Sequence, residues 1–218
     1  QFTHGISHEI NSPAKTLKNL LELLDEEYRQ HFDAEGIELL DMITLSSNRL
    51  CDTIGGVLAF SGCSRPPKFK EAVDCNSLVN EIMTELAPVI DRNKACIVVE
   101  QLPIINSSKK SLLQLFYHLI DNALKFTNTD SEPAVINISA QRVEKGYAFI
   151  VSDQGKGISP ERRESIFNVF ERLNSQAQHR GAGIGLALCR QIVTALGGKL
   201  WMEPAEHHGA AFHVYLPD

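Results

Sequence analysis

Apolar residues recur at steps of three and four along the first part of the chain, the spacing of one face of a helix. They fall in two runs: Ile6, Ile10, Leu17, Leu20 and Leu24, then Leu40, Ile43, Leu50, Ile54 and Val57. The short break at residues 31–36 predicts that the two helices pack as an antiparallel hairpin. A single hairpin buries only half of each apolar stripe, so we expect two copies to pair into a four-helix bundle, which makes a homodimer.

A proline-rich, charged segment follows the predicted hairpin. Residues 66–74 contain Pro66 and Pro67, which is typical of a linker. The pattern of apolar residues also changes here, from one helical period to a mixture of periods. We therefore expect a dimerisation domain at residues 1–65 and a second domain at residues 75–218.

The second domain combines helical spacing with the two-residue alternation of strands. Its expected helices are residues 76–92, 108–126, 160–172 and 184–196. Its expected strands are residues 135–140, 147–152, 200–203 and 212–216, paired through turns at Lys145-Gly146 and His208-Gly209. Hairpin-linked strands beside consecutive helices favour an α+β fold, in which the helical hairpin precedes an α/β sandwich.

Composition narrows the classes of partner and compartment. The 218 residues carry a formal net charge of −6 without a dense run of Lys or Arg, which argues against nucleic acid as a partner. Five widely spaced cysteines without a Cys-x-x-Cys pair fit a reduced compartment. No apolar run approaches the roughly 20 residues of a membrane span. We expect a cytoplasmic fragment whose upstream sensor domain lies outside it.

The predicted helix at residues 108–126 has two unlike faces. One narrow stripe is polar and contains Gln114, His118, Asn122 and Lys125, while the opposite side contains Leu112, Phe116, Leu119 and Ala123. The apolar side must face the sheet. A polar stripe alone is more often a solvated surface, so its meaning depends on the motifs that follow it.

Two glycine-rich segments are candidates for a nucleotide site. Asp153 follows an apolar strand and precedes Gly155 and Gly157, so a carboxylate able to accept from the amine of adenine stands beside backbone that a ligand can approach. By itself this motif is weak, because a structural aspartate in a glycine-rich turn gives the same pattern. Residues 181–186 (GAGIGL) lead into a predicted helix, and the N–H groups of such a helix start form an anion site.

Four motifs stand in order along this domain: residues 118–126 (HLIDNALKF), 153–158 (DQGKGI), 167–173 (FNVFERL) and 181–186 (GAGIGL). Together they closely resemble the N, G1, F and G2 boxes of histidine kinases, within the Bergerat-fold ATPase superfamily. The resemblance implies ATP and Mg²⁺ as cofactors. It implies that Asp153 reads adenine, that Asn122 holds Mg²⁺, and that Lys125 and Arg172 contact phosphates. It implies that the remaining cofactor-binding residues are Phe126, Gly155, Gly157, Ile158, Gly181, Gly183, Gly185 and Leu186.

Residues 2–13 (FTHGISHEINSP) resemble the H box of the same family, which makes His8 the implied phosphoacceptor. Helix geometry agrees, because the isoleucines two residues to either side belong to the core and leave His8 on the exposed face. A neutral imidazole keeps one ring nitrogen as a nucleophile, and Glu9 is positioned in sequence to take the proton. His4, one turn earlier, is a rival acceptor by exposure alone.

Two positions depart from the family pattern. His118 replaces an Asn that often helps to hold the metal, and an imidazole is a poor ligand for Mg²⁺, which prefers oxygen. We therefore take Asn122 as the metal ligand, with His118 as a second candidate, and expect weaker metal binding or slower turnover. Ser12 stands where many members have the Thr or Asn that supports phosphatase activity.

Three functions remain open from the sequence. The resemblance implies that the chain phosphorylates its own His8 from ATP and passes the phosphoryl group to an aspartate of a response-regulator receiver domain. A conformational ATPase of the Hsp90, MutL or gyrase type shares the fold. Those enzymes resemble one another in having a Glu that activates water at the place of His118, and this chain lacks that general base. A pseudokinase scaffold would bind nucleotide and partner with phosphotransfer impaired through His118.

Overall fold

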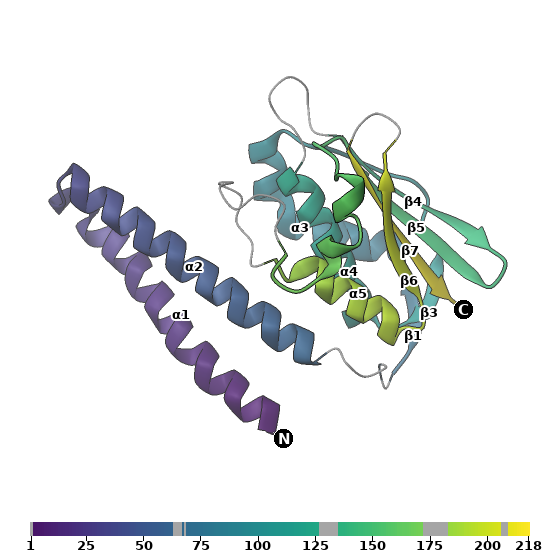
Figure 1. Cartoon of the computed structure of the whole chain (residues 1–218), viewed down its shortest axis with the longest axis horizontal. Helices are drawn as coiled ribbons and strands as arrows, with labels where there is room; N and C mark the ends of the chain where they lie inside the picture. Colours follow the sequence, from purple (N-terminus) through teal and green to yellow (C-terminus); the bar gives the residue numbers. More distant parts are fainter. Residues whose placement is uncertain (1, 63–66, 68, 127–134, 172–182, 206–208) are drawn as a thin grey trace.

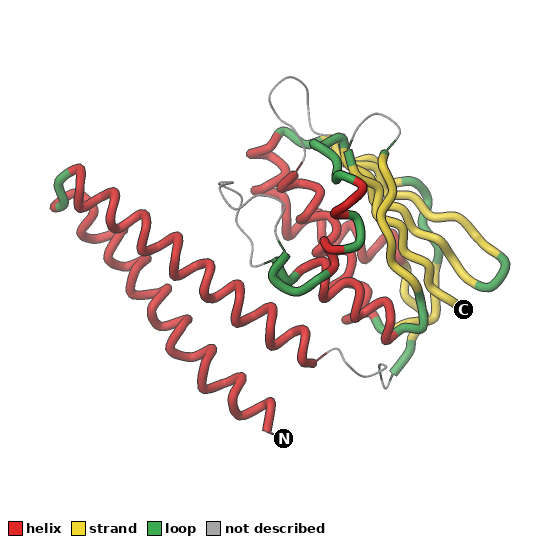
Figure 2. The backbone as a smooth tube through the Cα atoms, in the orientation of Figure 1, coloured by secondary structure: helices red, strands yellow, loops and turns green. Residues whose placement is uncertain are grey.

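The computed structural model describes residues 2–62, 67, 69–126, 135–171, 183–205 and 209–218, and it describes the side chains of these residues except at 2–11, 61 and 62. The chain forms two bodies, a long helical hairpin at residues 2–62 and a sheet domain at residues 69–218 (Figure 1). In the sheet domain, helices pack against one face of a sheet (Figure 2). The predicted α+β fold is confirmed.

The hairpin consists of two long antiparallel helices. Helix α1 spans Phe2–Tyr28, a 3₁₀ turn spans Arg29–His31, and helix α2 spans Ala34–Gly62. The turn is fixed by side chains at the tip: the Arg29 guanidinium donates to Asp25 of α1 and to Asp41 of α2, the latter at 2.8 Å. Pro13 lies inside α1, and the helix continues through it.

The two helices bury their facing apolar sides against each other. Ala14 and Leu21 of α1 and Leu40 of α2 are among the buried residues, as is the small polar residue Ser47. The Cys51 thiol of α2 donates to the Ala14 carbonyl of α1 at 3.4 Å. This contact sets residue 14 beside residue 51 and so defines the register of the antiparallel pair.

The sheet domain contains one large and one small sheet. The large sheet has the order β2-β4-β5-β7-β6, in which β2 is parallel to β4 and all other neighbours are antiparallel. Its strands span Cys96–Val99 (β2), Val135–Val143 (β4), Gly146–Asp153 (β5), Lys199–Pro204 (β6) and Ala210–Pro217 (β7). The small sheet pairs β1, Glu71–Asp74, with β3, Ile104–Ser107.

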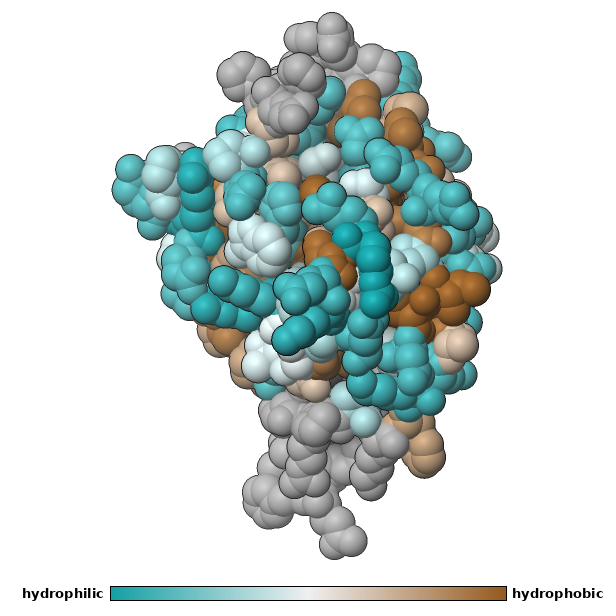
Figure 3. All heavy atoms as spheres, turned by 90° about the vertical axis from the view of Figure 1, so that its right-hand side faces the viewer, coloured by the Kyte–Doolittle hydropathy of each residue, from teal (hydrophilic) through white to brown (hydrophobic). Residues whose placement is uncertain are grey.

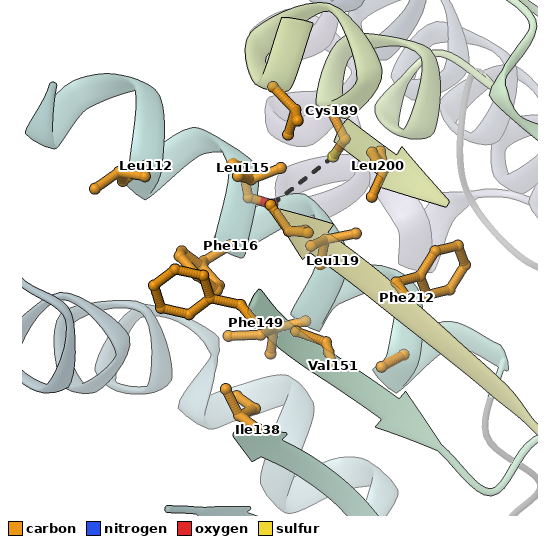
Figure 4. Close-up of a cluster of buried hydrophobic side chains, with 14 of the residues drawn as sticks. Leu112, Leu115, Phe116, Leu119, Ile138, Phe149, Val151, Cys189, Leu200 and Phe212 are labelled. Carbon is orange, nitrogen blue, oxygen red and sulfur yellow. Dashed lines mark hydrogen bonds between the residues drawn. The ribbon is translucent and has the colours of Figure 1, made fainter. Parts of the chain in front are cut away.

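Helices α3, Cys75–Asn93, α4, Lys109–Phe126, and α5, Gly185–Ala195, cover one face of the large sheet (Figure 2). Alternate strand residues point into this layer, so Phe149 of β5 meets Phe116 of α4 edge to face, with ring centroids 5.3 Å apart. The Cys189 thiol of α5 contacts the Leu115 carbonyl of α4 at 3.7 Å (Figure 4). As predicted, Leu112, Phe116, Leu119 and Ala123 form the buried side of α4.

Most predicted elements of this domain match the structure within two or three residues at each end, but one helix is wrong. The helix expected at residues 160–172 is replaced by two 3₁₀ turns, Pro160–Arg162 and Ser165–Phe167. Phe170 has a positive φ of 67°, and its N–H donates to the Gly183 carbonyl at 2.9 Å instead of to a helical neighbour. Long-range pairing therefore replaced the local helix.

The sequence pattern missed the three shortest strands, β1, β2 and β3, each of four residues. Strand β1 falls in the segment assigned to the linker. The turn at Lys145-Gly146 joins β4 to β5 as expected, whereas His208 of the other predicted turn lies outside the described residues. Within the described parts of the chain, no helix is long and apolar enough to cross a bilayer.

The face of the large sheet turned away from the helices is open. Hydrophilic side chains cover much of it in Figure 3. A hollow of about 340 Å³ near the end of β5 is lined by outward-pointing residues that include Ser152, Glu203 and His213. Asp153 and Gln154 at the end of β5 also line this hollow, whereas its lining includes no residue of α4 or α5.

Candidate functional site

The centre of the candidate site is a buried carboxylate at the end of β5. Asp153 is only 4% exposed, and its Oδ1 accepts from the Gly155 N–H at 2.8 Å and the Ala210 N–H at 3.3 Å. Burial raises the pKa of Asp153, and the two backbone N–H donors partly offset that rise. Among the described residues nothing donates to its Oδ2, so this oxygen is available to a ligand amine.

Glycines allow the backbone to close tightly around this carboxylate. A Cβ on Gly155 would collide with the Phe126 carbonyl oxygen at the end of α4 and lie 2.7 Å from Asp153 Oδ1. Gly157 adopts a positive φ of 68°, which favours glycine. The segment after β5 and the end of α4 therefore meet at one place.

A second glycine region lies at the start of α5. Gly183 has a φ of 69°, and a Cβ there would lie 2.8 Å from the Glu171 carbonyl oxygen. The Gly183 carbonyl accepts the Phe170 N–H, so this turn is tied to the segment after β5. Helix α5 starts two residues later with its unpaired N–H groups, which makes its N-terminus a site for an anion.

Helix α4 presents its polar stripe to the same region. The ring of His118 faces the first residue of α5, since a Cβ on Gly185 would lie 3.5 Å from His118 Nδ1. Burial is the main cause that lowers the pKa of His118; Asp121 opposes this and Lys125 adds to it. The imidazole is therefore neutral at pH 7, with one ring nitrogen as donor and the other as acceptor.

Lys125, an expected phosphate ligand, is held by a neighbour. Its Nζ lies 2.5 Å from Asp121 Oδ2, one helical turn back, and both side chains are partly exposed. Asn122 lies between them in sequence and is half-buried. The lysine must leave Asp121 or share it before it can bind a phosphate.

The described part of the chain does not supply a complete metal centre. Within the described residues no group of three or more His, Cys, Asp or Glu side chains converges on one point. Asn122 supplies one amide oxygen and His118 supplies nitrogen. This donor set fits a Mg²⁺ ion that keeps water ligands and is held mainly by the phosphates of a nucleotide.

Several predicted site residues cannot be placed fully. His8 and Glu9 belong to α1, but their side chains lie outside the described part of the chain, and so do Arg172 and Gly181 altogether. Two others, Ile158 and Leu186, are partly buried and pack against the core of the sheet domain. Phe126 is 41% exposed at the mouth of the site.

Two functional groups were missed from the sequence. The backbone N–H of Ala210 reaches Asp153 only because β7 pairs with β5, which no local pattern reveals. Asp121 was overlooked although it stands four residues before Lys125, the spacing at which opposite charges pair on a helix. The spacing alone was enough to find the second of these.

Comparison with known proteins assigns the same region. Residues 107–218 match the family described as histidine kinase-, DNA gyrase B-, and HSP90-like ATPases. This match covers α4, the segment after β5 and the start of α5, which together hold the site described above.

Two curated relatives match almost the whole chain. Cyanobacterial phytochrome A of Nostoc sp. is 30% identical over 217 residues, which cover 100% of this chain and 28% of the relative. The adaptive-response sensory kinase SasA of Thermosynechococcus vestitus is 30% identical over 97% of this chain and 58% of its own length. The chain thus spans less than a third of the first relative.

Solved structures share the architecture. The structure described as full-length ShkA in complex with AMPPNP has a TM-score of 0.75 and 24% identity, over 99% of this chain and 46% of that one. The mycobacterial sensor histidine kinase MprB has a TM-score of 0.55 and 26% identity, over 68% of this chain and 97% of that one. The first likeness includes the hairpin as well as the sheet domain.

Proposed function

The chain belongs to the histidine kinase-, DNA gyrase B- and HSP90-like ATPases, and within them to the histidine kinases. We propose that it phosphorylates its own His8 from ATP. We propose further that it passes the phosphoryl group to an aspartate of a receiver domain. One observation carries the proposal: a nucleotide-type site and a hairpin bearing His8 occur in one chain, with α2 packed on the sheet domain through Gly56 and Ile184. ATP as the substrate places this part of the protein in the cytoplasm.

Adenine recognition is assigned to the end of β5. Asp153 Oδ1 is held by two backbone N–H groups, so Oδ2 is left to accept from the exocyclic amine of adenine. The close approach of the Phe126 carbonyl to Gly155 shapes the wall beside it. Guanine presents a carbonyl at that position, so the carboxylate favours ATP over GTP.

The triphosphate is assigned to the start of α5 and the polar stripe of α4. The N–H groups at the helix start and the Lys125 ammonium stabilise negative charge there, once Lys125 turns from Asp121. Neutral His118 donates one hydrogen bond to a phosphate oxygen. Asn122 provides a ligand for Mg²⁺, which when bound neutralises charge on the phosphates.

His8 is assigned as the nucleophile. The unprotonated ring nitrogen of its neutral imidazole bonds to the γ-phosphorus as the bond to the β–γ bridging oxygen breaks, and ADP leaves. The other ring nitrogen then carries a positive charge, and Glu9 takes its proton. Catalysis rests on placing the two reactants together and on neutralising charge.

Dimerisation is proposed from the unpartnered apolar side of the hairpin. Large apolar side chains between 41% and 58% exposed recur on it, namely Leu17, Leu20, Leu23, Leu39, Met42, Ile43, Leu50 and Val57. A second copy of the chain buries this surface in a four-helix bundle. We assign the receiver domain as the second protein partner.

Incubation of the chain with γ-labelled ATP tests the proposal. We expect acid-labile label on the wild type, none on His8→Ala, and full labelling on the matched control His31→Ala at the hairpin tip. Full labelling of His8→Ala contradicts the assignment and directs attention to His4. A purified receiver domain should then remove the label as its own aspartate gains it.

Phosphate release and nucleotide binding, measured beside the labelling, separate the alternatives. Rapid release of inorganic phosphate without labelled protein identifies a conformational ATPase. Nucleotide binding that is unchanged by removal of Mg²⁺, without any label, identifies the scaffold. Both outcomes reject the proposed kinase activity.

A further inference from the structure

Two successive glycines interrupt the apolar pattern of α2, and they have unlike surroundings. A Cβ on Gly55 would meet nothing within 4 Å. A Cβ on Gly56 would lie 2.8 Å from Ile184 Cδ1, 2.9 Å from its Cβ and 3.0 Å from its Cγ2. Glycine inside a helix lowers its stability, and only at Gly56 does close approach of another element account for it.

The contact belongs to a wider seam between α2 and the sheet domain. Ala59 and Phe60 of α2 pack against the core of that domain. The carboxylate of Asp52 is close enough to Tyr117 of α4 to contribute to the raised pKa of that phenol, after the larger effects of burial and of two other carboxylates. Asp52 lies four residues before Gly56, and Ala59 and Phe60 lie three and four residues after it. At the helical period these residues form one stripe on α2, with Gly56 at its centre.

Ile184 is part of the turn that precedes the anion site. It is 3% exposed and stands between Gly183, which has a positive φ, and Gly185, which starts α5. Its carbonyl accepts the Leu188 N–H at 2.9 Å, the first hydrogen bond of the helix. A displacement of Ile184 would therefore also displace the backbone at the start of α5 that is assigned to the triphosphate.

The register of the hairpin puts this contact level with His8. The bond from Cys51 to Ala14 sets those residues side by side. His8 is six residues before Ala14, and Val57 is six residues after Cys51, so both lie about 9 Å from that bond in the same direction. Gly56 is thus within one residue of the height of His8 on the hairpin.

We infer that Gly56 is a positioning residue, which seats Ile184 on α2 and thereby sets the triphosphate end of the site at the height of His8. The inference rests on the proposed kinase function. Backbone and side chain approach so closely that the position of the sheet domain along α2 is fixed to within one residue. A side chain at residue 56 forces the two bodies apart.

This seam leaves the proposed dimer surface accessible. At about 100° per residue, Gly56 lies about 120° round the helix from Leu50. Leu50 is 49% exposed and belongs to the apolar side assigned to the second copy of the chain. A dimer can therefore form while each sheet domain remains seated on its own α2.

The adjacent glycines supply a matched pair of variants, Gly56→Ala and Gly55→Ala, with the same gain in helix propensity. In the full chain we expect Gly56→Ala to slow labelling of His8 by about tenfold or more, because misplacement of reactants by about 1 Å has such effects. Amide hydrogen exchange should accelerate in α2 near residue 56 and at residues 183–188. Gly55→Ala should match the wild type in both measurements.

A double variant tests whether the effect passes through Ile184. Replacing Ile184 by Gly removes Cδ1, Cβ and Cγ2, all three atoms that a new Cβ would meet. We expect Gly56→Ala to cost little in the Ile184→Gly background, so that labelling equals that of Ile184→Gly alone.

Three results would overturn the inference: labelling of Gly56→Ala at the Gly55→Ala rate, faster labelling of Gly56→Ala, or unchanged exchange at residues 183–188. If the wild type itself takes no label, the kinase proposal fails. In that case the exchange comparison still decides whether Gly56 seats the sheet domain on the hairpin.

Discussion

His118 of α4 and Gly185 of α5 face each other at the edge of the site: a Cβ on Gly185 would lie 3.5 Å from His118 Nδ1. The glycine leaves room for the ring, and burial keeps that ring neutral. A Cβ there would make an ordinary van der Waals contact with the ring, so only a side chain longer than that of Ala would compete with the imidazole for space. A substitution at residue 118 should therefore directly change the proposed phosphate and metal site.

Replacing His118 by Asn should strengthen nucleotide binding only when Mg²⁺ is present. The amide oxygen is a better ligand for this ion than an imidazole nitrogen, and a gain of about 1 kcal/mol lowers the dissociation constant about fivefold. Titration of a fluorescent ATP analogue with Mg²⁺ or with EDTA measures it. His213→Asn, on the open face of the sheet, is the control, and an equal effect in EDTA would contradict the metal role.

Replacing Asp153 by Asn should change how stability depends on pH. The folded state raises the pKa of this carboxyl above its ordinary 3.8, so the folded chain binds more protons than the unfolded chain in that window. Its contribution to stability is therefore greatest at low pH and is lost as pH rises through the raised pKa. Urea unfolding of both proteins from pH 4 to pH 7 should show the difference growing in favour of Asn.

Asp74 provides the opposite case for the same experiment. Hydrogen bonds from Ser77 and Asn76 lower its pKa, so its contribution is present at neutral pH and is lost as pH falls. Asp74→Asn should therefore lose its stability deficit in acid, where Asp153→Asn loses its advantage. Parallel curves for the two variants would refute the reasoning. In ATP binding, only Asp153→Asn should be impaired.

Replacing Asp121 by Asn should release Lys125 for the phosphates. The ion pair at 2.5 Å holds the ammonium beside α4, and its removal also reduces negative charge near the nucleotide. We expect the variant to have a several-fold lower dissociation constant for ATP than the wild type. This difference between the two proteins should become smaller as salt is added. Glu22→Gln breaks the comparable pair with Lys18 on α1 and should change nothing. The effect should vanish in a Lys125→Ala background.

Replacing Ile43 by Lys should separate the proposed dimer. Ile43 is 51% exposed on the apolar side of α2, and burying an ammonium there without a partner is strongly unfavourable. Sedimentation should give the mass of one chain for this variant and of two chains for the wild type. Ile104→Lys, at a 65% exposed site on β3, should leave the mass unchanged. A wild-type chain that sediments as a monomer would refute the prediction.

Sequence patterns were sufficient where one element carries its own signal. Helix α4 was predicted to within one residue because its apolar and polar sides separate cleanly at the helical period. Strands β1, β2 and β3 were missed because four residues are too few to establish alternation. The helix expected over Phe170 fails because Gly183, thirteen residues later, takes its N–H.

The contacts of the candidate site also divide into those that local sequence predicts and those that depend on distant parts of the chain. Asp153 and Gly155 stand two residues apart, so their hydrogen bond follows from local sequence. The Ala210 N–H arrives from the far end of the domain through β-pairing and has no local mark. The contact of Gly56 with Ile184 joins two bodies of the molecule. Local sequence can reveal that a glycine is unusual in a helix, but it cannot say what approaches it.

The order of the large sheet has a consequence for how the chain is made. Strand β7 is the last element, yet it lies between β5 and β6, and it brings Ala210 to Asp153. In a nascent chain that has not yet released β7, strand β5 has an unpaired edge, β6 has no sheet partner, and Asp153 lacks the Ala210 N–H. Premature termination before Ala210 would therefore yield an aggregation-prone product with an incomplete proposed adenine site, and chaperones or proteases would have to remove it.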